Sequence, residues 1–190
     1  MIELLKEIEL KLPELLKDPS VWKTVDVNYH PPRVERLWTQ LGENRLMLHV
    51  IHPCKFEEAL YHPHPWPSAM HILEGRYETG LGFKDTSNYI MDDPIKPYYF
   101  KIKQIAKLEL TGDNYYEMLD PKGWHYVRPI DDVCYSIMLI GKPWESNQGK
   151  GLPDPGKLLE LSEERKLEII QVFKDLTWYF DLKEENEGCE

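Results

Sequence analysis

The sequence predicts a mainly β protein, a β-sandwich or barrel with helices at both ends. Between Val21 and Trp144 the apolar residues recur mostly with a period of two, which is typical of half-buried strands. Turn signals rich in proline separate these runs, as they do in sandwiches and barrels. Before and after this region the apolar period is close to 3.6, which indicates helices.

Residues 1–17 are expected to form one or two short helices. Their apolar residues share one helical face: Ile2, Leu4, Leu5, Ile8 and Leu12. Pro13 interrupts the pattern, and it either ends the first helix or opens a second.

Seven strands are expected in the central region. Gly42, Glu43 and Asn44 read as a hairpin connection, and a turn is expected at Glu74 and Gly75. The last strand is a near-continuous apolar run, which favours a central buried position. The seven strands are Val34–Leu41, Arg45–His52, two strands within Met70–Phe83, Lys101–Leu110, Tyr115–Leu119 and Val133–Ile140.

A helix from Ser162 to about Phe180 follows a linker rich in glycine and proline at residues 146–157. Ser162 is the expected N-cap, and two glutamates follow it where the helix dipole favours acid. The expected buried stripe consists of Leu167, Ile169, Ile170, Phe173 or Lys174, Leu176, Trp178 and Phe180. At this length we expect one domain over residues 1–190, with the barrel at about 30–144.

Charge and cysteine content narrow the classes of function. The formal net charge is -10, so neither nucleic acid nor an anionic membrane is an expected partner. No segment has the length and hydrophobicity of a membrane span or the apolar core of a signal peptide. The cysteines are three in number and include no Cys-x-x-Cys pair, which favours a cytoplasmic location without a disulfide scaffold.

Three histidines indicate a metal site. His62 and His64 are separated by one residue, so in an extended strand both imidazoles point to the same face. His125 follows in the segment Pro121-Lys122-Gly123-Trp124-His125. Neutral imidazoles bind Fe, Ni, Zn, Cu and Mn, so a local pair with one distant histidine predicts a divalent metal site with open positions.

These two segments resemble the motifs of the cupin superfamily. The first motif is Gly, five residues, His-x-His, three or four residues, Glu, six residues and Gly; here His62, His64 and Gly75 match it. The second motif is Gly, five residues, Pro-x-Gly, two residues, His, three residues and Asn; the segment that ends in His125 matches it with one residue fewer before the histidine. The resemblance implies a double-stranded β-helix barrel with a divalent metal inside one mouth.

The chain also departs from the cupin motifs. Phe56 stands in place of the first glycine, Ser68 and Ala69 in place of the carboxylate ligand, and Pro129 in place of the asparagine. The remaining three-histidine site resembles that of the thiol dioxygenase branch, which implies ferrous iron. That branch also has a Ser-x-His-x-Tyr run, of which only the serine, Ser136, is present here.

His71 has two interpretations. It follows Ala69 by two residues, and could act as a fourth ligand in place of the missing carboxylate. Alternatively it is a barrel-interior histidine that hydrogen-bonds a group behind the ligands. His30, His49 and His52 are not expected to be ligands, and His49 and His52 differ in parity along one strand, so they cannot both face the cavity.

Other side chains are candidates for the substrate-binding wall. Arginines could hold a carboxylate by a bidentate contact, and aromatic residues could form walls, although barrel packing is the alternative for each of them. The main candidates for binding substrate are Arg45, Arg76, Trp66, Tyr116 and Trp124, with Arg36, Arg128, Tyr77 and Tyr135 as further members of the same two classes.

The expected function is that of a metal-dependent cupin enzyme, with dioxygenase-type or related chemistry on a small polar molecule. The metal implied is Fe, with Zn, Ni or Mn as alternatives. A cupin that binds or senses a small ligand without turnover is the second hypothesis. A metal-free sugar isomerase or epimerase is the third, and the intact set of histidines argues against it. The amphipathic C-terminal helix further suggests a homodimer.

Overall fold

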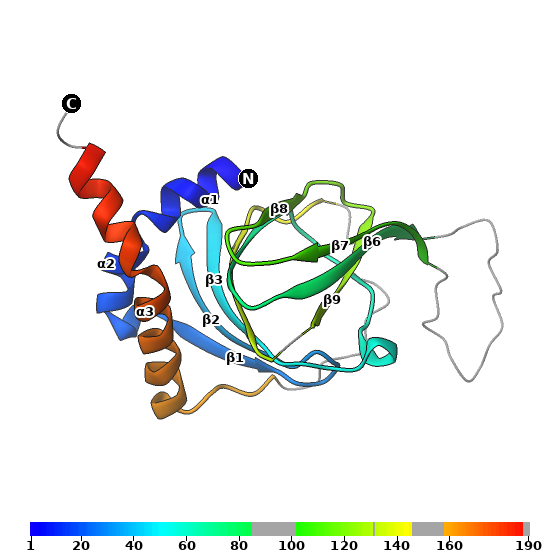
Figure 1. Ribbon diagram of the computed structural model, residues 1–190, viewed down its shortest axis with the longest axis horizontal. Helices are drawn as coiled ribbons and strands as arrows, with labels where there is room; N and C mark the ends of the chain where they lie inside the picture. The colour runs from blue at the N-terminus through cyan, green and yellow to red at the C-terminus, as the bar shows by residue number, and fades with distance from the viewer. Residues whose placement is uncertain (85–101, 131, 146–157, 188–190) are drawn as a thin grey trace.

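The protein consists of a helical layer and two antiparallel β-sheets that form a sandwich (Figure 1). The computed structural model describes residues 1–84, 102–130, 132–145 and 158–187, and for residues 179–187 only the course of a helix. The predicted fold class, mainly β with helices at both ends, is confirmed.

Sheet A has six strands in the order β1-β2-β3-β10-β5-β8, and sheet B has four in the order β4-β9-β6-β7. The strands of sheet A are β1 (Lys23–Val27), β2 (Val34–Leu41), β3 (Asn44–Ile51), β5 (Ser68–Glu74), β8 (Tyr115–Met118) and β10 (Cys134–Ile140). Those of sheet B are β4 (His62–Pro63), β6 (Tyr77–Lys84), β7 (Ile102–Leu110) and β9 (Gly123–Pro129). The helices are α1 (Ile2–Glu9), α2 (Leu12–Lys17) and α3 (Glu163–Glu187), with single 3₁₀ turns at Pro19–Val21 and Phe56–Glu58.

Three of these strands and some boundaries differ from the sequence prediction. The sequence did not single out β1, β4 or β9 as strands, and β1 begins before the expected start of the barrel near residue 30. Helix α3 continues to Glu187, past the expected end at Phe180, because the intervening residues include no glycine or proline. The predicted linker at 146–157 lies outside the described residues.

Sheet A separates two hydrophobic cores because its side chains alternate between its two faces. One core lies between sheet A and the helices, and includes Leu37, Leu48, Ile137, Leu139 and Phe173. The other lies between the two sheets, and includes Met47, Met70, Ile72, Tyr77 and Met138. The near-continuous apolar run of β10 supplies residues to both cores, as expected of a strand that is covered on both faces.

Helix α3 packs on sheet A through part of the predicted stripe. Ile169, Ile170 and Phe173 are buried, as expected, but Leu167 and Trp178 are 46% and 62% exposed. The buried stripe continues instead through Thr177, whose hydroxyl donates to the carbonyl of Phe173 and so satisfies its own polar group in the core.

A buried polar network attaches helix α1 to sheet A. The Glu9 carboxylate accepts a hydrogen bond from the Tyr115 hydroxyl at 2.7 Å and lies 2.7 Å from Nδ1 of His71. The rings of His71 and Tyr115 stack with centroids 3.9 Å apart. Each carboxylate oxygen of Glu9 therefore has a partner, which offsets the cost of burying this acid.

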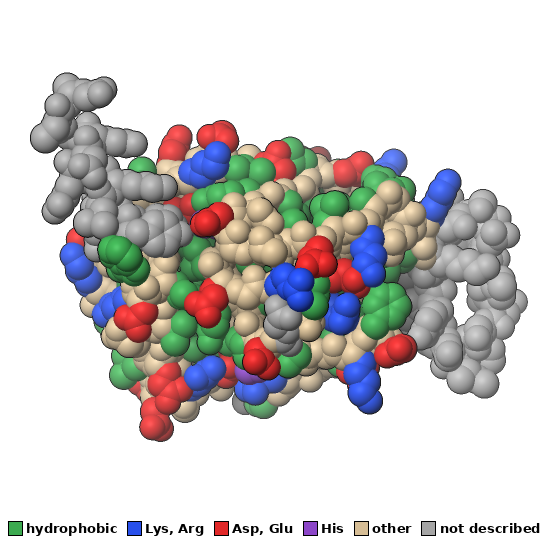
Figure 2. All heavy atoms as spheres, in the orientation of Figure 1, with side chains coloured by type: hydrophobic (Ala, Val, Ile, Leu, Met, Phe, Trp, Pro, Cys, Tyr) green, Lys and Arg blue, Asp and Glu red, His purple; other side chains and the backbone are tan. Residues whose placement is uncertain are grey.

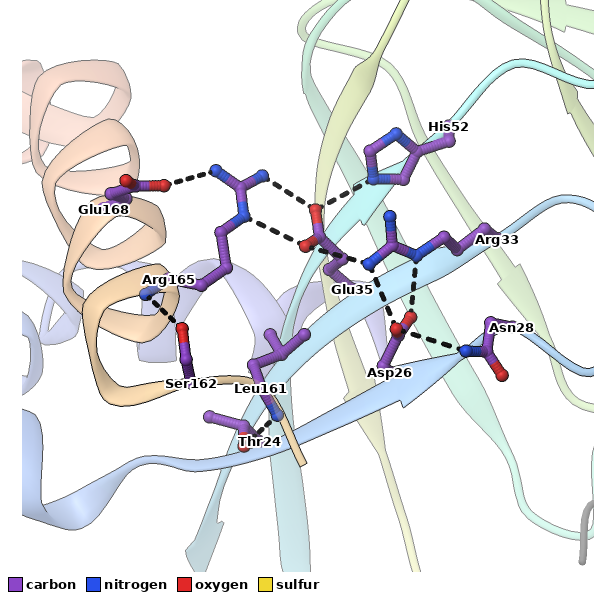
Figure 3. Close-up of polar contacts among 10 residues, drawn as sticks. All are labelled: Thr24, Asp26, Asn28, Arg33, Glu35, His52, Leu161, Ser162, Arg165 and Glu168. Atoms are coloured by element: carbon purple, nitrogen blue, oxygen red, sulfur yellow. Dashed lines mark hydrogen bonds and ion pairs between the residues drawn. The ribbon is translucent and has the colours of Figure 1, made fainter. Parts of the chain in front are cut away.

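A second network joins α3 to the outer face of sheet A (Figure 3). Both carboxylate oxygens of Glu35 accept hydrogen bonds from Arg165, at 2.9 and 2.7 Å, and His52 lies 2.8 Å from the same group. Arg33 adds a longer contact at 3.4 Å. Burial by itself raises the pKa of Glu35, but the hydrogen bonds from Arg165 and His52 outweigh it and lower the pKa to about 2.

The face shown in Figure 2 carries acidic and basic side chains interspersed with apolar ones over its described residues. None of the described helices is long and apolar enough to cross a membrane.

Replacing Glu35 with Gln is expected to lower the free energy of unfolding by about 2 kcal/mol at pH 7. The pKa of about 2 lies below the ordinary value of 4.5, so the contribution of the carboxylate is complete above about pH 4.5 and is lost as the pH falls towards 2. Urea unfolding from pH 7 to pH 3 measures the free energy of unfolding of the wild-type protein and the variant. The difference between the two free energies should narrow below pH 4.5.

The matched control is Glu168→Gln, because Glu168 also pairs with Arg165, at 2.8 Å, but is 54% exposed. Exposed pairs contribute little, so this variant should lose less than about 0.5 kcal/mol at any pH. Equal losses in the two variants would contradict the assignment of the α3 attachment to Glu35.

Candidate metal centre

The three histidines of the sequence motifs meet between the two sheets. His62 lies on β4 directly opposite His125 on β9, because the two strands pair antiparallel. His64 follows two residues later, just beyond the end of β4. The three side chains form a cluster of possible metal ligands in which all ligand atoms lie within 4.8 Å of one another.

The Nε2 atoms converge on one point. Nε2 of His125 is 3.1 Å from Nε2 of His62 and 3.0 Å from Nε2 of His64. Two imidazole nitrogens that share one ion at about 2.1 Å from it are about 3 Å apart when they subtend roughly a right angle. The two separations therefore fit nitrogens that bind a common divalent ion.

The Nδ1 atoms of the same rings face away from this point and contact other groups. Nδ1 of His62 lies 3.1 Å from the carbonyl oxygen of Leu60, to which it can only donate. Nδ1 of His64 is 3.0 Å from the Ser68 hydroxyl. Nδ1 of His125 has longer contacts, 3.5 Å, with the hydroxyls of Thr79 and Tyr116. Such partners orient ligating imidazoles and leave Nε2 for the metal.

Burial keeps all three rings neutral. It lowers the pKa of His62 to about 4, and lowers the pKa values of His64 and His125 well below the ordinary value. With Nδ1 protonated, the Nε2 lone pair of His125 lies about 3 Å from those of His62 and His64, an arrangement that a cation between them stabilises. The donor set and its protonation thus fit a divalent metal.

The histidines line a cavity of about 350 Å³. Its walls come mainly from sheet A and are largely apolar, with Val25, Val27, Val34, Met47, Ile51, Met70 and Met138 among the lining residues. The polar lining consists of Tyr29, His30, Arg36, His49, Trp66 and the three clustered histidines. The volume and the few convergent polar groups are typical of a site for a small molecule.

Of the predicted substrate-binding residues, Trp66 lines this cavity. Arg45 stacks on Trp38, with Cζ 4.5 Å from the ring centroid, and Arg76 pairs with Glu109 on the surface at 2.7 Å. The Tyr116 hydroxyl contacts His125 from behind and accepts a hydrogen bond from Tyr77 at 3.1 Å. Trp124 is buried on β9, where side chains alternate with that of His125.

His71 lies outside the cluster, which corrects its interpretation as a fourth ligand. Met70 and Ile72 on β5 face the space between the sheets, so the strand alternation turns His71 towards the helices, where it contacts Glu9. Ala69 faces the same helical side, in the core between sheet A and the helices. The alternative interpretation, an interior histidine with a hydrogen-bond partner, agrees with its burial and its contact with Glu9, but this partner lies on helix α1 and not behind the metal ligands.

Two histidines in the cavity were not proposed from the sequence as binding residues. His49 accepts a hydrogen bond from Nε of Arg36 at 2.9 Å, and the ring of His30 lies 6.0 Å from that of His62. His49 shares the parity of Met47 and Ile51 on β3, and this parity was the available signal. His52 has the opposite parity and contacts Glu35 on the helical side.

No protein-family model matches the chain, and neither does any curated protein. Among solved structures it is similar to hydroxypropylphosphonic acid epoxidase from S. wedmorenis, at 10% identity and a TM-score of 0.46 over 65% of this chain and 56% of that one. It is also similar to AerE from Microcystis aeruginosa, at 20% identity and a TM-score of 0.44 over 75% of this chain and 53% of that one. The chain is similar as well to KdgF from Halomonas sp., at 10% identity and a TM-score of 0.42 over 65% of this chain and 87% of that one.

The chain thus spans little more than half the length of the first two of these structures. The predicted sandwich or barrel is borne out by the two antiparallel sheets of the chain itself. The interpretation of the site rests on the geometry of the three histidines.

Replacing Ser68 with Ala is expected to weaken binding of a divalent metal about tenfold, because the buried Ser68 hydroxyl is the partner of Nδ1 of His64. Competition with a chromophoric chelator for Zn²⁺ measures the affinity. The control is Ser136→Ala, since Ser136 is equally buried but its hydroxyl contacts Met70 Sδ at 3.7 Å. Equal affinities in the two variants would contradict a role for Ser68 in orienting His64.

Proposed function

We propose that the protein is a metal-dependent enzyme with oxygenase-type chemistry on a small polar molecule, and that iron is its metal. The observation that carries the proposal is the convergence of the Nε2 atoms of His62, His64 and His125 at the wall of a cavity of about 350 Å³. Three neutral ligands leave the ion its full charge and open positions, and a ferrous ion held this way supplies the means to activate O2.

The protein's own residues enclose the guest molecule and orient the metal-binding imidazoles. The clustered histidines fix one end of the cavity, and the apolar wall residues Met47, Met70 and Met138 exclude water around a guest molecule. Behind His125, burial raises the pKa values of Tyr77 and Tyr116, so both hydroxyls stay protonated at neutral pH. Their role is to hold the imidazole in place.

The interior of β10 argues against a thiol substrate. In the thiol dioxygenase pattern, a histidine and a tyrosine follow the serine at alternate positions, which here are Met138 and Ile140. Met138 lines the cavity and Ile140 packs in the core between the sheets. Neither side chain can accept a proton from a thiol, so we propose a substrate other than cysteine.

The protein as purified is expected to contain about one equivalent of divalent metal per chain. The variants His62→Ala, His64→Ala and His125→Ala should each contain less than a tenth of this, because loss of one of three ligands opens the site. Plasma mass spectrometry of each purified protein measures the metal content, and circular dichroism checks the fold.

The matched control is His52→Gln, because His52 lies on the helical side of sheet A and Gln can still donate to Glu35. This variant should retain the metal. The proposal is rejected if the wild-type protein binds no Fe²⁺, Zn²⁺, Ni²⁺ or Mn²⁺ even after reconstitution, or if the three alanine variants retain metal like the control.

Loaded with Fe²⁺, the protein is expected to consume no O2 with cysteine and to consume O2 with at least one small carboxylic acid or diketone. An oxygen electrode with a panel of such compounds measures the uptake, and the His64→Ala variant corrects for free iron. Uptake with cysteine would contradict the assignment from Met138 and Ile140. Metal-dependent retention of a panel compound without O2 uptake would instead support a non-catalytic binding module.

A further inference from the structure

Among the described residues that line the cavity, Arg36 is the one with a permanently charged side chain. No Asp, Glu or Lys belongs to the described part of the lining. Most of the other residues there are Val, Met, Ile, Pro or aromatic side chains. The charge of a molecule that enters the cavity is therefore matched by Arg36 or by a metal ion on the three histidines.

Arg36 is held by a neutral partner. It lies on β2 directly opposite His49 on β3, and its Nε donates to Nε2 of His49 at 2.9 Å. Burial, and then the neighbouring charge of Arg36, keep the pKa of His49 well below its ordinary value, so His49 accepts this bond as a neutral ring. The hydrogen bond fixes the orientation of the guanidinium but leaves its charge uncompensated.

Arg36 thereby differs from most arginines of the chain. Arg33 pairs with Asp26, Arg76 with Glu109, Arg128 with Glu78 and Arg165 with Glu35. Among the described residues, no carboxylate pairs with Arg36. The nearest acid along β2, Glu35, points to the opposite face of the sheet, where it contacts Arg165 and His52.

The free edge of the guanidinium suits a carboxylate. Nε is engaged with His49, so the two terminal NH2 groups remain as a pair of parallel donors, the geometry that binds both oxygens of a planar oxyacid. Burial lowers the pKa of Arg36 to about 10, so the group is still charged at neutral pH. A charge that lacks a carboxylate partner in a largely apolar cavity is stabilised when an anion enters.

We propose that Arg36 is the anion-binding residue of the cavity and that the substrate class is small monocarboxylic acids with an apolar body. One cation matches one carboxylate, and the wall of Val and Met side chains matches a short aliphatic chain. This inference rests on the proposed function in taking the cavity of the three histidines as the substrate site.

The test uses protein freed of metal with a chelator, so that a carboxylate cannot bind to an ion on the histidines. Titration calorimetry compares pentanoate with its neutral analogue pentanamide. The wild-type protein is expected to bind pentanoate about ten to a hundred times more tightly than the amide, as a charge-assisted pair predicts. In Arg36→Met the two affinities should become equal within about threefold.

The control is Arg45→Met, because Arg45 also lacks a carboxylate partner in the described structure but stacks on Trp38 outside the cavity. It should keep the wild-type preference. If Arg36→Met does not fold by circular dichroism, Arg36→Lys replaces it; this variant keeps the charge without the planar fork and should bind pentanoate several times more weakly, with the amide unchanged. A wild-type protein without the preference, or Arg36 variants that behave like the control, would overturn the proposal.

A third ligand, butylphosphonate, separates the two kinds of oxyanion. It is expected to bind no more tightly than pentanoate, and binding tenfold tighter would overturn the assignment to carboxylic acids. The metal-free design also separates this inference from the metal centre. If the protein binds no metal but prefers pentanoate through Arg36, the proposed function fails and the anion site stands; if it binds metal but shows no preference, the anion site fails.

Discussion

The alternation of side chains along the strands of sheet A is the constraint on which the rest of the structure depends. Strands β2, β3, β5, β8 and β10 each supply one face to the helices and the other to the space between the sheets. On β2 and β3, the same rule sends Glu35 and His52 to helix α3, and Arg36 and His49 into the cavity. The polar network that attaches helix α3 and the polar pair that faces the cavity therefore lie on opposite faces of the same sheet.

The metal centre follows from strand pairing in sheet B. The pairing of β4 with β9 places His62 opposite His125, although the two residues are 63 positions apart in sequence. Strand β4 is only two residues long, and His64 follows just beyond its end, between Pro63 and Pro65. Nε2 of His64 still lies 3.0 Å from Nε2 of His125, so two histidines of the same parity both reach the ring on β9.

Much of the fold could be predicted because period-two alternation marks most of the strands, and the His-x-His pair could be predicted because two residues of one parity share a face. The prediction failed where the direction of a side chain depends on a residue that is far away in sequence. The face to which His71 points depends on which side of sheet A the helices cover, and its partner Glu9 is 62 residues distant. The same holds for Leu167 and Trp178, which lie on helix α3 outside the stripe of Ile169, Ile170 and Phe173 that packs on the sheet. Arg36 could be identified as a candidate, but choosing it over Arg45 and Arg76 required knowing which arginines already have partners.

The electrostatic character of the cavity links the two sites. Each of the three clustered histidines is neutral, because burial lowers its pKa, and so is His49. No carboxylate belongs to the cavity lining among the described residues. A divalent ion on the histidines would therefore add two positive charges to that of Arg36 without any negative charge from these walls. Burial of uncompensated like charges is costly, and the cost falls when a negatively charged molecule lies between them. The absence of an acid from these walls and the three-histidine ligand set therefore favour the same guest, an anion that contacts Arg36 at one end and the histidine centre at the other.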